Sequence, residues 1–275
     1  MNKKKMLTFP NAKINLGLRV IEKRSDGFHN IETIFIPVPM CDMLEIIPTS
    51  STSRFSVSGL TLDGNTKDNL CMKAFALFQD EVGCPNVAIH LHKVIPSGAG
   101  LGGGSSDAAF TLKLLASMFS PTLSHRKLVD MAGRIGSDCA FFIDNTTSLA
   151  TSRGEVLQPI NLNLDNLFLV LINPRMHVNT SQAYAGISPQ KTTNNLSKLV
   201  LEPIETWQKT ITNDFEETVF QIHPAIGKIK EEMLSHGATY SAMTGSGSTV
   251  FGLFRQEPPK LESHFPTYDI YRYIL

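Results

Sequence analysis

The sequence predicts an α+β fold, because strand-like and helix-like stretches follow one another in no regular βαβ order along its 275 residues. In KINLGLRV, residues 13–20, apolar and polar residues alternate as in a half-buried strand. A helix is expected from about Ser105, because apolar residues there recur at helical spacing: Ala108, Leu112, Leu115 and Phe119. This length suffices for one large domain or two smaller ones, and we place a boundary near residue 158, between domains 1–158 and 159–275.

Turn and capping residues predict the remaining elements. An Asp-Gly turn at residues 24–27 predicts a hairpin between the first strand and NIETIFIPV. Asp68 is expected to cap a helix that runs to about Val82, and Ser124 a helix that ends at Gly136. We further expect a loop at 187–197, a helical stretch at 214–235, and strands at 43–47, 54–57, 87–94, 155–160, 167–172, 238–242 and 250–254.

The charge balance argues against a nucleic-acid or membrane partner. Lys and Arg total 25, Asp and Glu total 25, and no basic run exceeds Lys3–Lys5. The four cysteines show neither C-x-x-C spacing nor the density of a disulfide-rich domain, so we expect reduced thiols. With no signal-like or membrane-spanning apolar run, we expect a cytoplasmic protein that binds a small molecule. The sequence leaves the oligomeric state open.

The run IPSGAGLGGGSSDAA, residues 95–109, is the strongest candidate for a ligand site. It contains a dinucleotide-type G-x-G-x-x-G, but no acid lies between Asp107 and Asp130 to hold a ribose. It also contains a Walker-type frame, but Gly104, not lysine, follows Gly103. Glycine amides at a helix N-terminus, with two serine hydroxyls beside them, still predict a phosphate cradle. The alternative is a glycine turn that only permits tight packing.

Three stretches together resemble the superfamily of galactokinase, homoserine kinase, mevalonate kinase and phosphomevalonate kinase. They are PNAKINLGL at 10–18, the glycine loop, and TGSGSTVFGLF at 244–254. DGFHNIETIF at 26–35 and GSDCAFF at 136–142 are similar to the branch whose acceptor is 4-diphosphocytidyl-2-C-methyl-D-erythritol. The resemblance implies a two-domain small-molecule kinase fold, with an S5-like N-terminal nucleotide domain, a ferredoxin-like C-terminal domain and an active site in the cleft between them.

The same resemblance implies the reaction and its residues. The γ-phosphate of ATP would pass to the 2-hydroxyl of the acceptor with Mg²⁺ assisting, in the non-mevalonate route to isoprenoid precursors. Such a transfer needs a cation at the phosphate and a group that receives the hydroxyl proton, and the family implies Lys13 and Asp138 for these roles. The ATP phosphate loop would comprise Pro96, Ser97, Gly98, Ala99, Gly100, Leu101, Gly102, Gly103, Gly104, Ser105 and Ser106. Without the resemblance, Lys13 reads as a solvated strand lysine and Asp138 as a cap or turn residue.

The acceptor residues are implied in the same way. His29 would read the cytosine edge, Phe28 and Tyr184 would form aromatic walls, and Asn15 shares the polar strand face of Lys13. Phe28 stands where the family usually has tyrosine, so a hydroxyl is lost there. The alternatives are a turn histidine for His29 and an ordinary core aromatic for Phe28. The family would place the adenine around residues 62–68.

Other polar residues carry weaker signals. His90 and His92 share one strand face without a third metal ligand nearby, so we expect a solvated face. Asp107 would help hold Mg²⁺ or, as we favour, complement the positive helix N-terminus; the metal ligands are otherwise unassigned. The functional alternatives are a kinase of the superfamily with another acceptor and a non-catalytic nucleotide sensor. DGFH argues against the first, and Lys13 with Asp138 against the second.

Overall fold

The computed structural model of the chain describes residues 6–62, 68–190 and 195–275, and it confirms the α+β prediction. The chain divides into two compact units, neither of which is continuous in sequence. Unit 1 comprises Met1–Ala12, Met40–Ser97 and Gly102–Thr146, and unit 2 comprises Lys13–Pro39, Gly98–Leu101 and Thr147–Leu275. The glycine loop is therefore divided between the two units, and the boundary near residue 158 stays a prediction.

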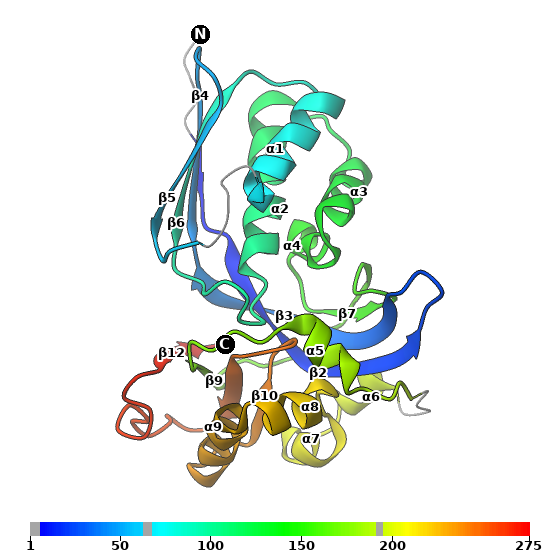
Figure 1. Ribbon diagram of the computed structural model, residues 1–275, viewed down its shortest axis with the longest axis vertical. Coiled ribbons are helices and arrows are strands. Elements are labelled where there is room, and N and C mark those ends of the chain that lie inside the picture. The colour runs from blue at the N-terminus through cyan, green and yellow to red at the C-terminus, as the bar shows by residue number, and fades with distance from the viewer. Residues whose placement is uncertain (1–5, 63–67, 191–194) are drawn as a thin grey trace. The chain divides into compact units, whose positions relative to one another are not determined.

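Unit 1 is a four-stranded sheet with helices packed on one face (Figure 1). The sheet order is β1-β4-β6-β5, with β5 and β6 parallel and the other pairs antiparallel. Its strands are β1 (Met6–Thr8), β4 (Met43–Pro48), β5 (Arg54–Gly59) and β6 (Val87–Lys93). Its helices are α1 (Leu70–Glu81), α2 (Gly103–Phe119), α3 (His125–Ile135), the short 3₁₀ helix η2 (Ser137–Cys139) and α4 (Phe141–Asp144). Val87, Ile89 and Leu91 alternate into the core, as the sequence pattern predicts.

The helix ends in unit 1 follow the expected capping chemistry, with two shifts. Asn69, not Asp68, caps α1, because its side chain accepts a hydrogen bond from the Cys71 amide at 2.9 Å. Ser124 caps α3 as predicted. Helix α2 begins at Gly103, two residues before the expected start, because the left-handed Gly102 (φ 71°) turns the chain into the helix.

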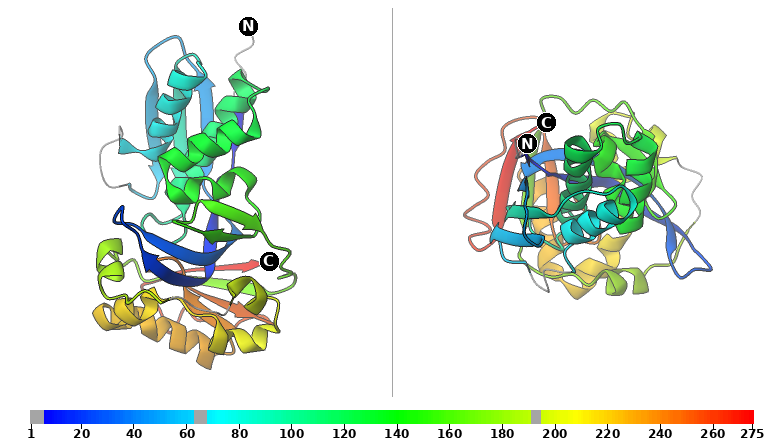
Figure 2. Two further views of the ribbon diagram at one scale, coloured as in Figure 1. Left: turned by 90° about the vertical axis from the view of Figure 1, so that its right-hand side faces the viewer. Right: turned by 90° about the horizontal axis from the view of Figure 1, so that it is seen from above.

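Unit 2 contains two sheets. The first has the order β2-β3-β7-β8 and the second, which is antiparallel, β10-β11-β9-β12. The strands are β2 (Asn11–Lys23), β3 (His29–Cys41), β7 (Ser148–Thr151), β8 (Val156–Pro159), β9 (Phe168–Asn173), β10 (Tyr240–Met243), β11 (Val250–Phe254) and β12 (Asp269–Ile274). The helices are α5 (Thr180–Ala185), α6 (Leu196–Leu199), α7 (Ile204–Thr210), α8 (Phe215–Ile222) and α9 (Pro224–Ser235). Helices α8 and α9 cover one face of the second sheet (Figure 2).

The predicted hairpin is confirmed, since β2 and β3 are neighbours and the Arg24 amide donates to the Phe28 carbonyl at 2.8 Å. The prediction of a half-buried first strand is wrong. Residues 11–18 are buried on both faces, and within unit 2 Leu18 pairs with residues 212–214 while Asn15 bonds the 244 turn. The helical stretch predicted at 214–235 is two helices, because Pro224 cannot donate the hydrogen bond that would continue α8.

The loop predicted at 187–197 ends where α6 begins, and residues 191–194 of it lie outside the described residues. The elements that the sequence did not predict are mostly short: β1, β7, β12, η2, α4, α5, α6 and α7. All four cysteines are free thiols, as expected. Within the described part of the chain, no helix combines the length and apolar character that crossing a membrane requires.

Candidate functional site

Lys13 lies in a buried polar cluster of unit 2. Only 3% of its surface is exposed, so it is not the solvated strand lysine of the alternative interpretation. Its Nζ donates to Asn15 Oδ1 at 2.6 Å and to the Gly100 carbonyl at 2.9 Å, and it lies 5.2 Å from the centre of the Phe35 ring. The structure therefore brings Lys13 and Asn15 together with the 98–101 half of the glycine loop.

The turn that begins at Thr244 joins the same cluster. The Thr244 hydroxyl oxygen lies 3.0 Å from the backbone nitrogen of Asn15, which donates to it, and 3.0 Å from the Gly100 carbonyl oxygen. The Asn15 side chain donates to Thr33 Oγ1 at 3.0 Å. Strand β2, the glycine loop and the third glycine motif are far apart in sequence, but their residues in unit 2 form one hydrogen-bonded network.

Two glycines of the loop are required by the fold itself. Gly100 has φ 79°, and a Cβ there would lie 2.0 Å from the Thr244 carbonyl oxygen. A Cβ on Gly103 would lie 2.8 Å from both Ile95 and Lys93 Nζ. At these two positions the packing interpretation of the glycine run is correct.

At position 104, neither the backbone conformation nor close packing requires a glycine. Gly104 is exposed, its backbone is not left-handed, and a Cβ would meet only the Leu70 side chain at an ordinary 3.7 Å. It lies in the first turn of the 17-residue helix α2, which no side chain caps. Bare, uncapped backbone at the N-terminus of a long helix suits an anion such as a phosphate group.

The two serines that follow differ in environment. Ser105 is half-buried, whereas Ser106 is completely buried, and its hydroxyl has no hydrogen-bond partner among the described residues. A buried hydroxyl without a partner costs free energy, so its position at this helix end supports a ligand-binding role. Pro96 and Ser97 lie on the same loop in unit 1, half-buried and exposed respectively.

A buried ion-pair cluster underlies the start of α2. Lys93 Nζ bonds the carboxylate of Asp42 and that of Asp107, the latter at 2.9 Å. Burial raises the pKa of Asp107, because the Lys93 charge offsets the desolvation only in part. Burial opposes the charge of Lys93, but the two carboxylates outweigh it and raise the pKa of the lysine. Asp107 is therefore paired with a lysine, a role that neither sequence interpretation included.

Asp138 lies in η2, half-buried and in unit 1. It is not the cap of that helix, which is Gly136. The next residue, Cys139, packs against the start of α2: its thiol hydrogen-bonds Ser105, and burial raises the pKa of this thiol to about 12. The structure therefore places Asp138 one residue from a side chain that contacts Ser105 of the phosphate loop.

The three predicted aromatic residues of the acceptor site lie in unit 2, where His29 stacks on Tyr184 and Phe28 contacts Arg153. The rings of His29 and Tyr184 are stacked, with centroids 4.6 Å apart and planes inclined by 16°. Burial, with a smaller effect from the Lys23 charge, lowers the pKa of His29, so its imidazole is neutral near pH 7. Phe28 is 54% exposed and lies 5.1 Å from the Arg153 guanidinium, so it is not a core aromatic.

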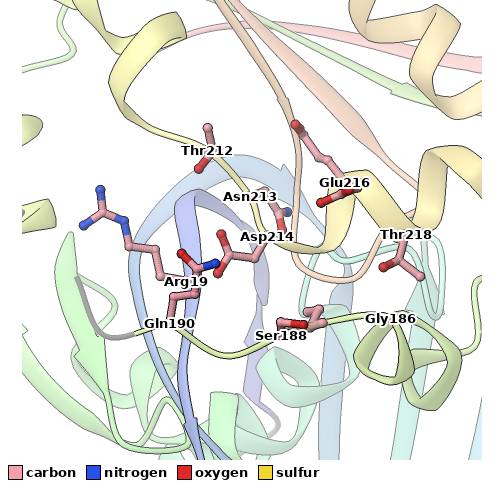
Figure 3. A pocket seen from close by; sticks show the side chains of 11 residues that line it. Arg19, Gly186, Ser188, Gln190, Thr212, Asn213, Asp214, Glu216 and Thr218 are labelled. Atoms are coloured by element: carbon pink, nitrogen blue, oxygen red, sulfur yellow. The ribbon is translucent and has the colours of Figure 1, made fainter.

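A polar hollow of about 540 Å³ lies elsewhere in unit 2, and its lining contains none of the predicted site residues (Figure 3). Arg19, Asn213 and Asp214 contribute to it. Asp214 accepts a hydrogen bond from the Val20 amide at 2.8 Å, and Asn213 donates to the Met243 and Gly245 carbonyls at 2.7 and 2.8 Å. The hollow thus adjoins residues that fix β2 and the third glycine motif.

Sequence reasoning missed Thr33, Asn213 and the Lys93 cluster. Thr33 and Asn213 act through partners 18 and at least 30 residues away, and no local pattern indicates such bonds. Lys93 directly precedes the loop, so a search for a cation near the glycines on the N-terminal side would have found it. Of the region expected to hold the adenine, residues 63–67 lie outside the described residues.

Comparisons with known proteins agree on one family. Residues 69–145 match the GHMP kinases N terminal domain, and residues 196–266 match the GHMP kinases C terminal. A 4-diphosphocytidyl-2-C-methyl-D-erythritol kinase from Cytophaga hutchinsonii is 49% identical over 92% of this chain and 94% of that protein. A crystal structure of a 4-(cytidine 5'-diphospho)-2C-methyl-D-erythritol kinase is 30% identical, with a TM-score of 0.77 and 90% coverage of each chain. A homoserine kinase structure from Cytophaga hutchinsonii, 15% identical with a TM-score of 0.69, covers 99% of this chain and 95% of that one and shares the fold.

Proposed function

The chain belongs to the 4-diphosphocytidyl-2-C-methyl-D-erythritol kinase family of the GHMP kinases, and from this premise we propose its reaction and site. It transfers the γ-phosphate of ATP to the 2-hydroxyl of 4-diphosphocytidyl-2-C-methyl-D-erythritol. The observation that carries the proposal is the network in which Lys13, Gly100 and Thr244 join the three motifs typical of these kinases. The two family matches fall on either side of residue 158, which supports the proposed domain boundary there.

We propose that the nucleotide phosphates bind the N-terminal end of α2. The exposed Gly104 offers an amide without a side chain in the way, and Ser105 and Ser106 offer hydroxyls. The unpartnered Ser106 hydroxyl also suits Mg²⁺, which prefers oxygen ligands. When bound, Mg²⁺ would neutralise part of the charge on the phosphate oxygens.

Lys13 is the proposed cation of the transfer. Its ammonium group is oriented by Asn15 and the Gly100 carbonyl, so its position is set before a ligand arrives. A fixed positive charge stabilises the charge on the transferring phosphoryl group without reorganisation during the reaction. The Asn15 side chain, itself bonded to Thr33, acts as a positioning residue for Lys13.

Asp138 is the proposed general base. It would accept the proton of the acceptor hydroxyl as that oxygen bonds to phosphorus, and its half-buried place beside the start of α2 supports this role. Asp138→Asn is expected to keep ATP affinity while lowering turnover at least about a hundredfold, the usual scale for a lost general base. Asp130→Asn, which changes an exposed acid of α3, is the matched control. An unchanged rate in Asp138→Asn would remove this residue from the mechanism.

For the acceptor, we propose that the cytosine is recognised by His29, Tyr184 and Phe28. The stacked His29 and Tyr184 rings provide a flat aromatic surface, and the exposed Phe28 provides a second one. The test is a substrate panel that compares the cytidine-diphosphate-linked acceptor with mevalonate, homoserine and galactose. Preferential phosphorylation of any of the last three would refute the acceptor but not the kinase class. We also propose a cytoplasmic location, where the four thiols stay reduced.

A further inference from the structure

Three potential metal ligands of unit 2 gather outside the site described above. Glu232 lies in the last turn of α9, His236 caps the end of that helix, and His264 lies in the segment between β11 and β12. One ligand atom of each residue lies within 4.8 Å of those of the other two. Two imidazole nitrogens and a carboxylate oxygen form a typical ligand set for a transition metal.

The carboxylate of Glu232 faces both imidazole rings. Its Oε2 lies 3.5 Å from His236 Nδ1 and 3.6 Å from His264 Nδ1. Ligands at about 2.0–2.2 Å from a tetrahedral ion lie roughly 3.3–3.6 Å from one another, so these spacings already suit a shared ion. The His264 side chain is 42% exposed, so its ring has room to rotate toward an ion.

The surroundings favour a site and not a chance cluster of surface groups. The His236 ring is oriented by a contact of 2.8 Å between Nδ1 and the Glu232 carbonyl oxygen, and by edge-on packing against His264 with centroids 4.5 Å apart. In this contact Nδ1 carries the proton, so binding an ion through Nδ1 would break the contact and release that proton. A hollow of about 400 Å³, lined by Glu232, His264 and Tyr268 among others, leaves room for a water molecule as fourth ligand.

We propose that Glu232, His236 and His264 form a zinc-binding site that fastens the segment between β11 and β12 to the end of α9. The two nitrogen ligands favour Zn²⁺ over Mg²⁺ or Ca²⁺, which prefer oxygen. The segment 255–268 contains turns but no helix or strand of its own before β12 begins. A metal that cross-links it to a helix would stabilise the folded state of unit 2 and would leave the phosphate-transfer residues unchanged.

The test uses Zn²⁺ alone with the metal-free full-length chain, by competition against a chromophoric chelator in a non-coordinating buffer. One Zn²⁺ per chain is expected, with a micromolar or lower dissociation constant, weakened at least tenfold in His264→Ala and in Glu232→Gln. His90→Ala is the matched control, because it removes an imidazole that bonds Ser56 and Ser58 on a strand of unit 1. Zinc at a hundredfold excess over its dissociation constant should raise the melting temperature of the wild type by roughly 5 °C or more.

The variants should show no such rise in melting temperature. Circular dichroism of the metal-free variants will show whether they fold. Glu232→Gln keeps the side-chain size, so it tests zinc binding even if His264→Ala folds poorly. The proposal is overturned if the wild type binds no zinc at 100-fold the expected micromolar range, or if all variants bind it equally.

Discussion

Replacing Gly104 by alanine should affect the stability of the protein and its affinity for ATP differently. In the free protein the new Cβ would lie 3.7 Å from Leu70 Cδ1, an ordinary contact, and the backbone of this helical glycine is not left-handed. Alanine is favoured over glycine within a helix by up to about 1 kcal/mol. Gly104→Ala is therefore expected to keep or raise the melting temperature, by at most roughly 2–4 °C.

The effect on nucleotide binding should have the opposite sign. If phosphate oxygens approach the Gly104 amide, a methyl group there occupies their space, and we expect the KM for ATP to rise at least about tenfold, which corresponds to about 1.4 kcal/mol. Initial rates at saturating acceptor and varied ATP, together with thermal melts, measure both quantities on the same sample.

Gly133→Ala is the matched control. Gly133 lies within α3, and a Cβ there would meet nothing within 4 Å. It should bring a similar gain in stability with an unchanged KM for ATP. If Gly104→Ala also leaves the KM for ATP unchanged, the phosphates do not bind at the start of α2, and the reasoning from the uncapped helix end fails.

Three further perturbations test other parts of the structure. Gly100→Ala should lower the free energy of unfolding by at least about 2 kcal/mol, because it adds left-handed strain to a 2.0 Å clash with Thr244, and urea unfolding would show it. Lys93→Met leaves two buried carboxylates without their cation and should lower the free energy of unfolding by about 3–5 kcal/mol, and by less at low pH, where a carboxylate takes up a proton. Lys127→Met, which breaks a partly exposed ion pair, should lower it by less than about 1 kcal/mol. Equal losses in the two variants would contradict the burial argument. His29 should titrate below the ordinary value of about 6.5, so its contribution to stability is present above that pH and is lost as the pH falls; an NMR-detected pKa at or above 6.5 would refute this.

Local sequence rules predicted most elements of the fold because the causes of those elements are themselves local. Ser124 capped its helix as expected, and the alternation in β6 gave the correct buried face. The α1 cap was wrong by one residue because Asp68 and Asn69 are both good caps, and only the geometry of the first turn selects between them. Burial on both faces of β2 was not predictable, because that burial depends on partners nearly the whole chain away.

The candidate site likewise contains features that local sequence indicates and features that depend on distant residues. The glycine run by itself predicts a phosphate cradle, but the place of Lys13 beside Gly100 depends on a tertiary contact between residues 87 positions apart. Likewise, Lys93 and Asp42 are 51 residues apart, and a lysine that pairs with two acids looks like any surface lysine in the sequence. The resemblance identified Lys13, whereas for the Lys93 cluster the sequence offers only the position of Lys93 just before the loop and nothing that points to Asp42.

The interleaving of the two units along the chain sets the order in which the protein can fold. The amide of Val20 bonds Asp214, 194 residues later, and that of Asn15 bonds Thr244, 229 residues later. At about 5–20 residues per second, these two residues of β2 therefore wait roughly 10 to 45 s after their own synthesis for their partners. Unit 1 ends at Thr146, and its Asn11 waits for Asn145, only 134 residues later. On the ribosome, β2 is thus a 13-residue strand that stays open to premature pairing until these partners have been made.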